Sequence, residues 1–130
     1  IKKSVIYKYY YDFLIIVISN QSAINRGLTN HFNVNEIHEA IQEYLKKNGT
    51  QIDAFYYCPH RPDENCSCRK PNPGLFKKAS AELDIDLKSS WMIGDRDSDI
   101  QAALAAGCRS IKIKENSSIN DAVHSIINSK

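Results

Sequence analysis

Apolar residues follow two patterns that alternate along the 130-residue chain. Short continuous apolar runs, such as residues 13–18 (FLIIVI), are typical of strands buried on both faces of a sheet. Between these runs, apolar residues recur every three or four positions, which is the spacing of one helical face. Strands that alternate with helices in this way predict an α/β fold with a parallel sheet.

These patterns place the individual elements. Strands are predicted over residues 13–18, 52–57, Trp91–Gly94 and 110–114. The predicted helical faces are formed by Val34, Ile37, Ile41 and Leu45, by Leu75, Phe76, Ala79 and Leu83, by Ile100, Ala103 and Leu104, and by Ile119, Val123, Ile126 and Ile127. Gly49 and Gly107 are placed to end two helices, and Pro73 to begin another. No repeat or linker divides the chain, so we expect one domain over residues 1–130.

Composition and charge narrow the class of protein. With 42% hydrophobic and 25% charged residues, the chain has the composition of a soluble globular protein. Its net charge of +2 gives no reason to expect nucleic acid or a membrane as a partner. Lysines precede the apolar run at 13–18, but that run is too short for a signal peptide or a membrane span. A reducing, cytoplasmic setting is the default expectation, with thiols available to bind metal. A monomer is expected.

Special chemistry is concentrated in residues 58–74, CPHRPDENCSCRKPNPG, which hold three of the four cysteines and all four prolines. The ligand set C-x-H-x5-C-x-C consists of Cys58, His60, Cys66 and Cys68. Thiolate and imidazole suit tetrahedral zinc, and four protein ligands leave no open coordination position, so the site should be structural. A disulfide or unbound thiols are the alternative, although three cysteines cannot all pair. The fourth cysteine, Cys108, is expected to be a small buried residue.

This loop ends in two basic residues, Arg69 and Lys70. Lysine is a compact charge suited to a phosphate, while the arginine fork can bind a second anionic or hydroxylated group. Two adjacent basic residues alone are usually solvated surface. Fixed against a metal-bound loop at the ligand-binding edge of a sheet, they are better explained as anion binders.

A polar stretch also follows the first predicted strand, SNQS at residues 19–22. The hydroxyl of Ser19, directly after the strand, can donate to a phosphoryl oxygen together with loop N–H groups. The alternative is a serine that caps a helix or stabilises a turn.

The stretch GDRDSD at residues 94–99 follows another predicted strand. Asp95 lies directly past that strand, with Asp97 and Asp99 close by, and such carboxylates suit Mg²⁺. The alternative is helix N-terminal capping, which we expect Asp97 or Ser98 to perform as well. Because ligands bind beyond the carboxyl ends of parallel strands, all three polar stretches are expected at one edge of the sheet.

Taken together, these stretches resemble the haloacid dehalogenase superfamily, in the phosphatase branch that acts on heptose bisphosphate and histidinol phosphate. The resemblance covers about residues 13–113, and CPHRPDENCSCRKPNPG is its most specific part. SNQSAINRG (19–27) is similar to the second motif of the heptose enzymes, and MIGDRDSDIQAALAAG (92–107) to the fourth.

The resemblance implies a Rossmann-like (HAD-like) three-layer parallel sheet and a Mg²⁺-dependent sugar-phosphate phosphatase that also holds Zn²⁺. By position, Ser19 would bond the transferring phosphoryl group, Lys70 would neutralise it and Asp95 would hold magnesium. The implied substrate-binding residues are Asn20, Gln21, Ser22, Arg69 and Arg96. The implied zinc ligands are Cys58, His60, Cys66 and Cys68.

One family feature has no counterpart, namely the D-x-D motif that supplies the nucleophile and the acid–base aspartate. Asp12 cannot replace it, because it lies before the strand that leads to Ser19. The chain begins with Ile1 and its only methionine is Met92, so we expect the motif to precede Ile1 in a longer protein. Residues 1–130 alone are then expected to be inactive. A histidinol-phosphate phosphatase, disfavoured by NQSAINRG, and a non-catalytic zinc-stabilised phosphosugar-binding protein remain alternatives.

Overall fold

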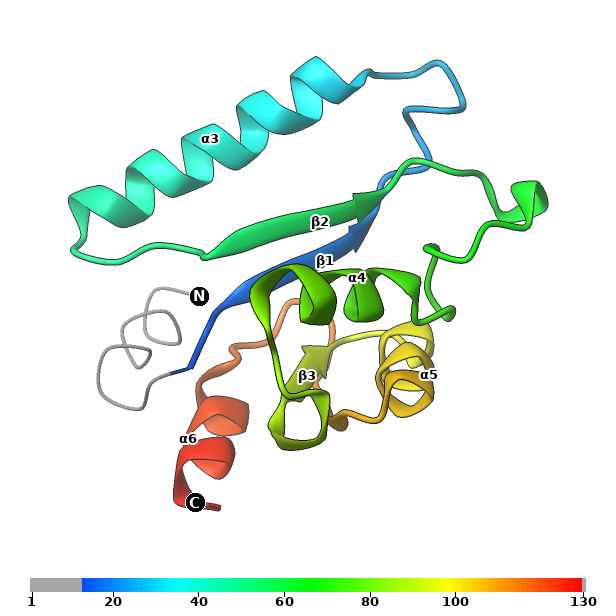
Figure 1. The fold of residues 1–130 in the computed structure, drawn as a ribbon. Coiled ribbons are helices and arrows are strands. Elements are labelled where there is room, and N and C mark those ends of the chain that lie inside the picture. The colour runs from blue at the N-terminus through cyan, green and yellow to red at the C-terminus, as the bar shows by residue number, and fades with distance from the viewer. Residues whose placement is uncertain (1–12, 130) are drawn as a thin grey trace. The chain divides into compact units, whose positions relative to one another are not determined.

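The computed structural model describes residues 13–129, and Asp12 therefore lies outside the described residues. The chain divides into two compact units, Ile1–Asn65 and Cys66–Lys130. Each unit contains one parallel pair of strands among its described residues (Figure 1). The continuous sheet implied by the family resemblance stays a prediction.

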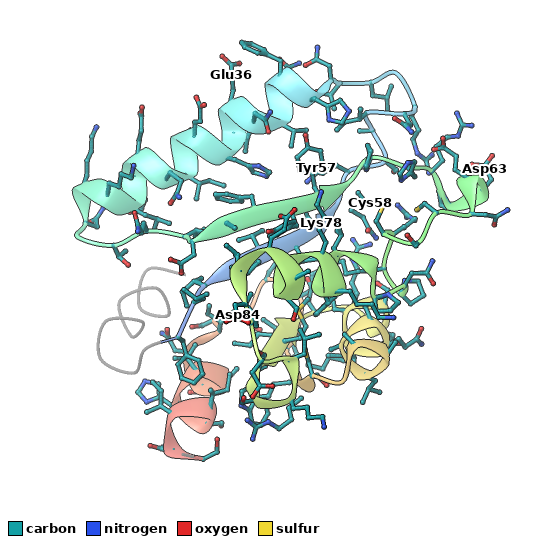
Figure 2. All side chains as sticks on the ribbon, viewed as in Figure 1. Glu36, Tyr57, Cys58, Asp63, Lys78 and Asp84 are labelled. Carbon is teal, nitrogen blue, oxygen red and sulfur yellow. The ribbon has the colours of Figure 1, made fainter. Side chains whose placement is uncertain are left out.

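The first unit is built on β1 (Ile16–Asn20) and β2 (Ala54–Cys58), which α3 (His31–Lys47) connects. The two strands pair in parallel, with Ser19 opposite Tyr57 and Asn20 opposite Cys58. Tyr57 and Cys58 lie near the carboxyl end of β2 (Figure 2). The strand predicted over residues 13–18 is therefore displaced, and Ser19 belongs to β1 itself rather than to the loop after it.

Helix α3 has the predicted C-terminal boundary. The Asn30 side chain accepts a 2.8 Å hydrogen bond from the Asn33 N–H and caps the N-terminus. At the other end Asn48 is the C-cap, and Gly49 follows in the left-handed region at φ +79°. Glycine adopts this conformation without a Cβ clash, which confirms its predicted role as the end of the helix.

The face that α3 turns toward the strands differs from the predicted one. Val34 and Leu45 are buried as expected, but Ile37 is 60% exposed and Ile41 is 37% exposed. The helix is rotated so that His38 stacks on Phe55 of β2, with ring centroids 4.2 Å apart. Gln42 then bonds both backbone groups of Ile52, at 2.6 Å and 2.8 Å. Aromatic stacking and two backbone hydrogen bonds thus replace the aliphatic contacts that the spacing predicted.

The second unit contains β3 (Trp91–Gly94) and β4 (Arg109–Lys112), paired in parallel with Gly94 opposite Lys112. Its helices are α4 (Gly74–Leu83), α5 (Asp97–Ala106) and α6 (Asn120–Asn128), with a short 3-10 turn, η2 (Leu87–Ser89). Helix α5 packs on both strands and contacts α4. Within residues 13–129, no helix combines the length and the apolar character needed to cross a membrane.

Small side chains allow α5 to lie close to its strands. Ala102 and Ala103 are completely buried, whereas Leu104, predicted on the same face, is 67% exposed. The helix ends at Gly107, in the left-handed region at φ +86°, as predicted. Cys108 follows and is buried, which confirms the prediction for this residue. Burial also raises the pKa of its thiol, so it stays protonated and unreactive near neutral pH.

Candidate functional site: a Cys/His loop and two polar strand ends

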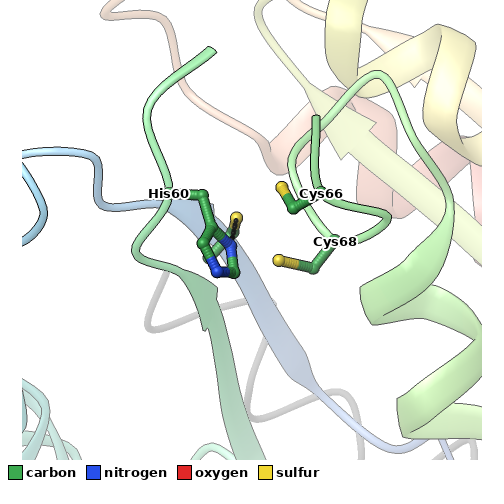
Figure 3. A group of neighbouring side chains, drawn as sticks. His60, Cys66 and Cys68 are labelled. Atoms are coloured by element: carbon green, nitrogen blue, oxygen red, sulfur yellow. Dashed lines mark hydrogen bonds between the residues drawn. The ribbon is translucent and has the colours of Figure 1, made fainter. Parts of the chain in front are cut away.

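The four predicted metal ligands lie together in one loop, residues 58–68, which we call the metal loop. Their ligand atoms all lie within 4.8 Å of one another (Figure 3). Cys58 is the last residue of β2 and is fully buried, and its Sγ lies 3.3 Å from Nδ1 of His60. The chain then passes through the 3-10 turn η1 (Pro62–Glu64) and through Asn65, at φ 51°, before the two remaining cysteines. None of the four cysteines forms a disulfide.

This donor set fits a structural zinc ion. Zinc bound at about 2.3 Å by sulfur and about 2.0 Å by nitrogen holds its four ligand atoms roughly 3.5–3.8 Å apart. The four ligand atoms would therefore have to move only slightly toward one another to bind zinc. The backbone N–H of Arg69 also donates to the Cys66 Sγ over 3.3 Å, and such a bond stabilises a thiolate. Three sulfur atoms and one imidazole would complete a tetrahedron around zinc and would leave no position for a catalytic water.

The chain after the metal loop is held in a tight turn. The Asn72 side chain donates to the Cys66 carbonyl at 2.8 Å, and the Gly74 N–H to the Ser67 carbonyl at 3.0 Å. A Cβ at Gly74 would lie 2.2 Å from that Ser67 oxygen, so only glycine fits. Arg69 and Lys70, both half-buried, are therefore positioned by a defined backbone turn.

Lys70 forms a nearly buried ion pair. Its Nζ lies 2.5 Å from Oδ1 of Asp99, and the two side chains are 11% and 7% exposed. The other carboxylate oxygen of Asp99 accepts the Arg96 backbone N–H at 3.2 Å. A Cβ at Gly94 would lie 2.5 Å from the Asp99 side chain, so a glycine there makes room for this carboxylate. Asp99 thus joins Lys70 to the loop that carries Asp95.

Sequence reasoning placed Asp99 near the site but gave it no role of its own. The available signal was its position in the first turn of α5, with a glycine just before Asp95. The partner of Asp99 comes from a residue 29 positions away, which no local pattern indicates.

Asp95 and Arg96 are both exposed, and Asp95 is the first residue after β3. The expected helix cap is wrong, since Arg96 is the N-cap of α5 and Asp97 and Ser98 lie inside the helix. Asp97 instead pairs with Lys112, with Nζ and Oδ1 2.6 Å apart, and the hydrogen bond and charge of that lysine lower the pKa of Asp97. Asp95 is left as the exposed carboxylate at the strand end.

The segment after β1 is organised by its own hydrogen bonds. The Gln21 amide donates to the Ser19 hydroxyl at 3.2 Å, and Nε of Arg26 donates to the Ser22 hydroxyl at 3.2 Å. Successive backbone bonds, such as Arg26 N–H to the Ser22 carbonyl at 3.0 Å, fold residues 21–29 into turns. Ser19 therefore belongs to neither a helix cap nor a turn, and its hydroxyl is oriented by Gln21.

The predicted site residues are thus divided between the two units. Ser19, Asn20, Gln21 and Ser22 belong to the first unit, and Arg69, Lys70, Asp95 and Arg96 to the second. Their convergence at one edge of a sheet stays a prediction.

Comparison with known proteins identifies the class of protein. Residues 67–128 match the family model described as HAD-hydrolase-like. The second half of the chain is thus similar to haloacid-dehalogenase-like proteins, and the α/β fold with parallel strands matches that of the solved HAD-like structures.

Curated relatives carry more specific names. The D-glycero-beta-D-manno-heptose-1,7-bisphosphate 7-phosphatase of Helicobacter pylori strain J99 is 44% identical over 103 residues, covering 78% of this chain and 56% of the relative. The Bordetella bronchiseptica protein of the same name is 39% identical over 97 residues, covering 75% of this chain and 54% of the relative. The chain spans about half the length of these curated relatives.

A solved structure shows the same likeness in three dimensions. The D,D-heptose 1,7-bisphosphate phosphatase of B. bronchiseptica, complexed with magnesium and phosphate, has a TM-score of 0.86 and 26% identity. The match covers 99% of this chain and 82% of that one. A HAD-like protein from Mesorhizobium loti, at 23% identity and a TM-score of 0.77, shares the fold.

Proposed function

We propose that the complete protein containing this chain is a magnesium-dependent phosphatase that removes the 7-phosphate from D-glycero-D-manno-heptose 1,7-bisphosphate. The observation that carries the proposal is the ammonium group of Lys70, held by Asp99 next to the loop of Asp95. The names of the relatives, and the magnesium and phosphate bound by the Bordetella structure, support the substrate and the metal.

Lys70 is suited to stabilise a phosphoryl group during transfer. Its ammonium group has three N–H donors, one of which Asp99 fixes in direction. A cation that is already oriented and largely desolvated costs little reorganisation when negative charge develops on the transferring oxygens. Phosphoryl transfer depends mainly on such positioning and charge stabilisation. Ser19 would donate a further hydrogen bond to the same group.

Asp95 would hold the magnesium ion. Its exposed carboxylate at the strand end is the kind of hard oxygen ligand that Mg²⁺ takes, usually one or two per site. When bound, the ion supplies positive charge to the phosphoryl oxygens. Arg69 and Arg96 would recognise the remainder of the substrate, including its second phosphate, together with Asn20, Gln21 and Ser22.

The nucleophile in this proposal belongs to a D-x-D segment that precedes residue 1 in the complete protein. Its first aspartate attacks phosphorus, the bond to the sugar oxygen breaks, and an aspartyl-phosphate forms. The second aspartate protonates the leaving oxygen and then takes a proton from the water that releases phosphate.

The remaining parts of the proposal concern zinc and the cellular setting. We assign the metal loop a structural Zn²⁺, because its donors fit a closed tetrahedral site. A reducing cytoplasm would keep its cysteines as thiols, and we expect the protein to act there as a monomer.

Phosphate release by the complete protein, with magnesium, tests the proposal. Heptose 1,7-bisphosphate is expected to turn over faster than histidinol phosphate, as NQSAINRG and the two arginines suggest. Faster turnover of histidinol phosphate would overturn the substrate and keep the phosphatase class. If folded, zinc-loaded protein hydrolyses neither compound, the phosphatase proposal fails in favour of a non-catalytic binding protein.

A further inference from the structure

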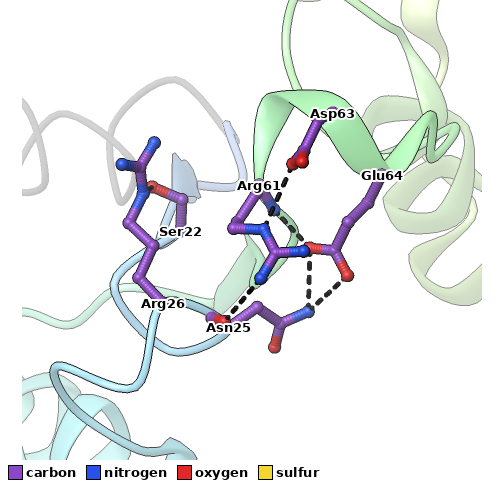
Figure 4. A network of polar contacts seen from close by, with 6 residues as sticks. All are labelled: Ser22, Asn25, Arg26, Arg61, Asp63 and Glu64. Carbon is purple, nitrogen blue, oxygen red and sulfur yellow. Dashed lines mark hydrogen bonds and ion pairs between the residues drawn. The ribbon is translucent and has the colours of Figure 1, made fainter.

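A network of polar contacts joins the metal loop to the segment that follows β1 (Figure 4). The Asn25 side-chain amide donates to both carboxylate oxygens of Glu64, at 3.2 Å and 3.1 Å. In the opposite direction, Nη1 of Arg61 donates to the Asn25 backbone carbonyl at 3.3 Å. Asn25 is thereby held through both its side chain and its backbone.

Glu64 also shapes the metal loop itself. One of its carboxylate oxygens accepts the Arg61 backbone N–H at 2.5 Å, which closes the short turn η1. Asp63 behaves differently, because it pairs with Nε of Arg61, at 3.1 Å, within the metal loop (Figure 4). Glu64 therefore spans the two segments, while Asp63 bonds within one of them.

The two segments are also connected where they leave β1 and β2. Asn20 and Cys58, the last residues of β1 and β2, are register partners, and the Gln21 N–H donates to the Cys58 carbonyl at 2.7 Å. Asn25 and Glu64 join the same two segments further from the sheet. Residues 20–28 are thus anchored at one end by the strand pair and in the middle by the metal loop.

We propose that Glu64 is a positioning residue that couples the metal loop, through Asn25 and Arg61, to residues 20–28. For catalysis the inference rests on the proposed function, in which Asn20, Gln21 and Ser22 line the substrate site. Metal binding at Cys58, His60, Cys66 and Cys68 fixes the loop that presents Glu64, and Glu64 in turn fixes the segment that carries these three residues.

Coupling of this kind is reciprocal. If bound metal orders residues 20–28 through Glu64, then loosening that segment must weaken metal binding by the same factor. The contacts are exposed, and a single hydrogen bond of this type changes an equilibrium by about three- to tenfold. The expected effects are therefore of that size and fall well short of unfolding.

The decisive experiment measures the zinc dissociation constant of the complete protein by competition with a chromophoric chelator. Glu64→Ala and Asn25→Ala are each expected to weaken zinc binding by about three- to tenfold. The double variant should be no weaker than the more affected single variant, because both remove one shared interaction. Asp63→Asn is the matched control, expected to bind zinc like the parent, and Glu64→Gln should restore most of the loss by keeping an acceptor oxygen. Additive losses, or a loss in Asp63→Asn equal to that in Glu64→Ala, would overturn the coupling.

Amide hydrogen exchange supplies a readout that does not depend on activity. In the parent protein, removal of zinc should speed exchange in residues 20–28, while in Glu64→Ala the segment should exchange fast with zinc bound. Unchanged exchange of this segment on zinc removal would contradict the inference.

Steady-state kinetics separates this inference from the proposed function. A higher KM in Glu64→Ala, with kcat close to that of the parent, is expected of a residue that positions a substrate-lining segment. If the complete protein is inactive but the zinc and exchange effects are found, the proposed function fails and the coupling stands. If it is active and Glu64→Ala matches the parent in zinc affinity, exchange and KM, the coupling fails alone.

Discussion

Two ion pairs involve aspartates of the same six residues, GDRDSD. Their N···O distances are nearly equal, but their exposure to solvent differs greatly. The Asp99–Lys70 and Asp97–Lys112 pairs have N···O distances of 2.5 Å and 2.6 Å. The side chains of the first pair are 7% and 11% exposed, and those of the second are 78% and 52% exposed. The two pairs are therefore alike in N···O distance and differ in how far their side chains are buried.

Burial changes what each pair can do. Charges shielded from water interact strongly, and a buried charge that loses its partner is severely destabilised. Exposed charges are screened by water and salt, and their pairing adds little to stability. Asp99 therefore fixes the direction of a cation inside the proposed phosphate site, while Asp97 and Lys112 form a surface contact beside it. This contrast provides a matched control for each variant below.

The largest expected effect is on turnover. In the complete protein, Lys70→Met should lower kcat by about a hundred- to a thousandfold, because it removes an oriented charge from the transferring phosphoryl group. Lys112→Met makes the same chemical change on the exposed pair and should leave kcat within a few fold of the parent. Steady-state phosphate release measures both variants. Equal kcat values for the two would show that burial does not distinguish the lysines.

Stability should separate the two aspartates in the same way. Asp99→Asn leaves the nearly buried Lys70 ammonium without its counter-charge, and we expect a loss of about 3–5 kcal/mol in the free energy of unfolding. Asp97→Asn should have no measurable effect. Urea unfolding of both variants, with magnesium and substrate absent, makes the comparison. A loss for Asp97→Asn as large as that for Asp99→Asn would refute the assignment of the two environments.

These differences also show what the sequence could and could not predict. The strand–helix alternation, the end of α3 before Gly49 and the closure of α5 at Gly107 follow from local patterns, and the structure confirms them. The grouping of the four proposed metal ligands could be predicted because eleven residues contain the whole set.

Features that depend on distant partners were missed. The local sequence around Asp97 and Asp99 offers two similar carboxylates, and only the fold decides that one meets Lys70 and the other Lys112. The orientation of α3 likewise depends on Phe55, a residue of β2, and so its predicted apolar face was partly wrong.

Metal content tests the loop that precedes Lys70. One zinc per chain is expected in protein purified under reducing conditions without chelator, and Cys68→Ser should abolish that stoichiometry by removing a thiolate ligand. Cys108→Ala, at a buried cysteine outside the loop, should retain the metal and serves as the control. Elemental analysis decides the matter, and protein without zinc under these conditions would contradict the metal assignment.

A smaller effect is expected at Arg69, the neighbour of Lys70. Arg69→Ala should raise KM several fold, or shift the preference between substrates, because the guanidinium is proposed to bind the rest of the substrate rather than the transferring group. Steady-state kinetics with heptose bisphosphate and with a monophosphate would show this. A fall in kcat as large as that of Lys70→Met, with KM unchanged, would reverse the two roles.

The binding of inorganic phosphate tests the central claim most directly, because it isolates phosphoryl recognition from the rest of the reaction. Calorimetric titration of the complete, magnesium-loaded protein should show phosphate binding to the parent and to Lys112→Met with similar affinity. Lys70→Met should bind phosphate at least about tenfold more weakly, since a charge-assisted contact to the anion is lost. Equal affinity of all three proteins for phosphate would contradict the claim that the buried Lys70–Asp99 pair forms the phosphate site.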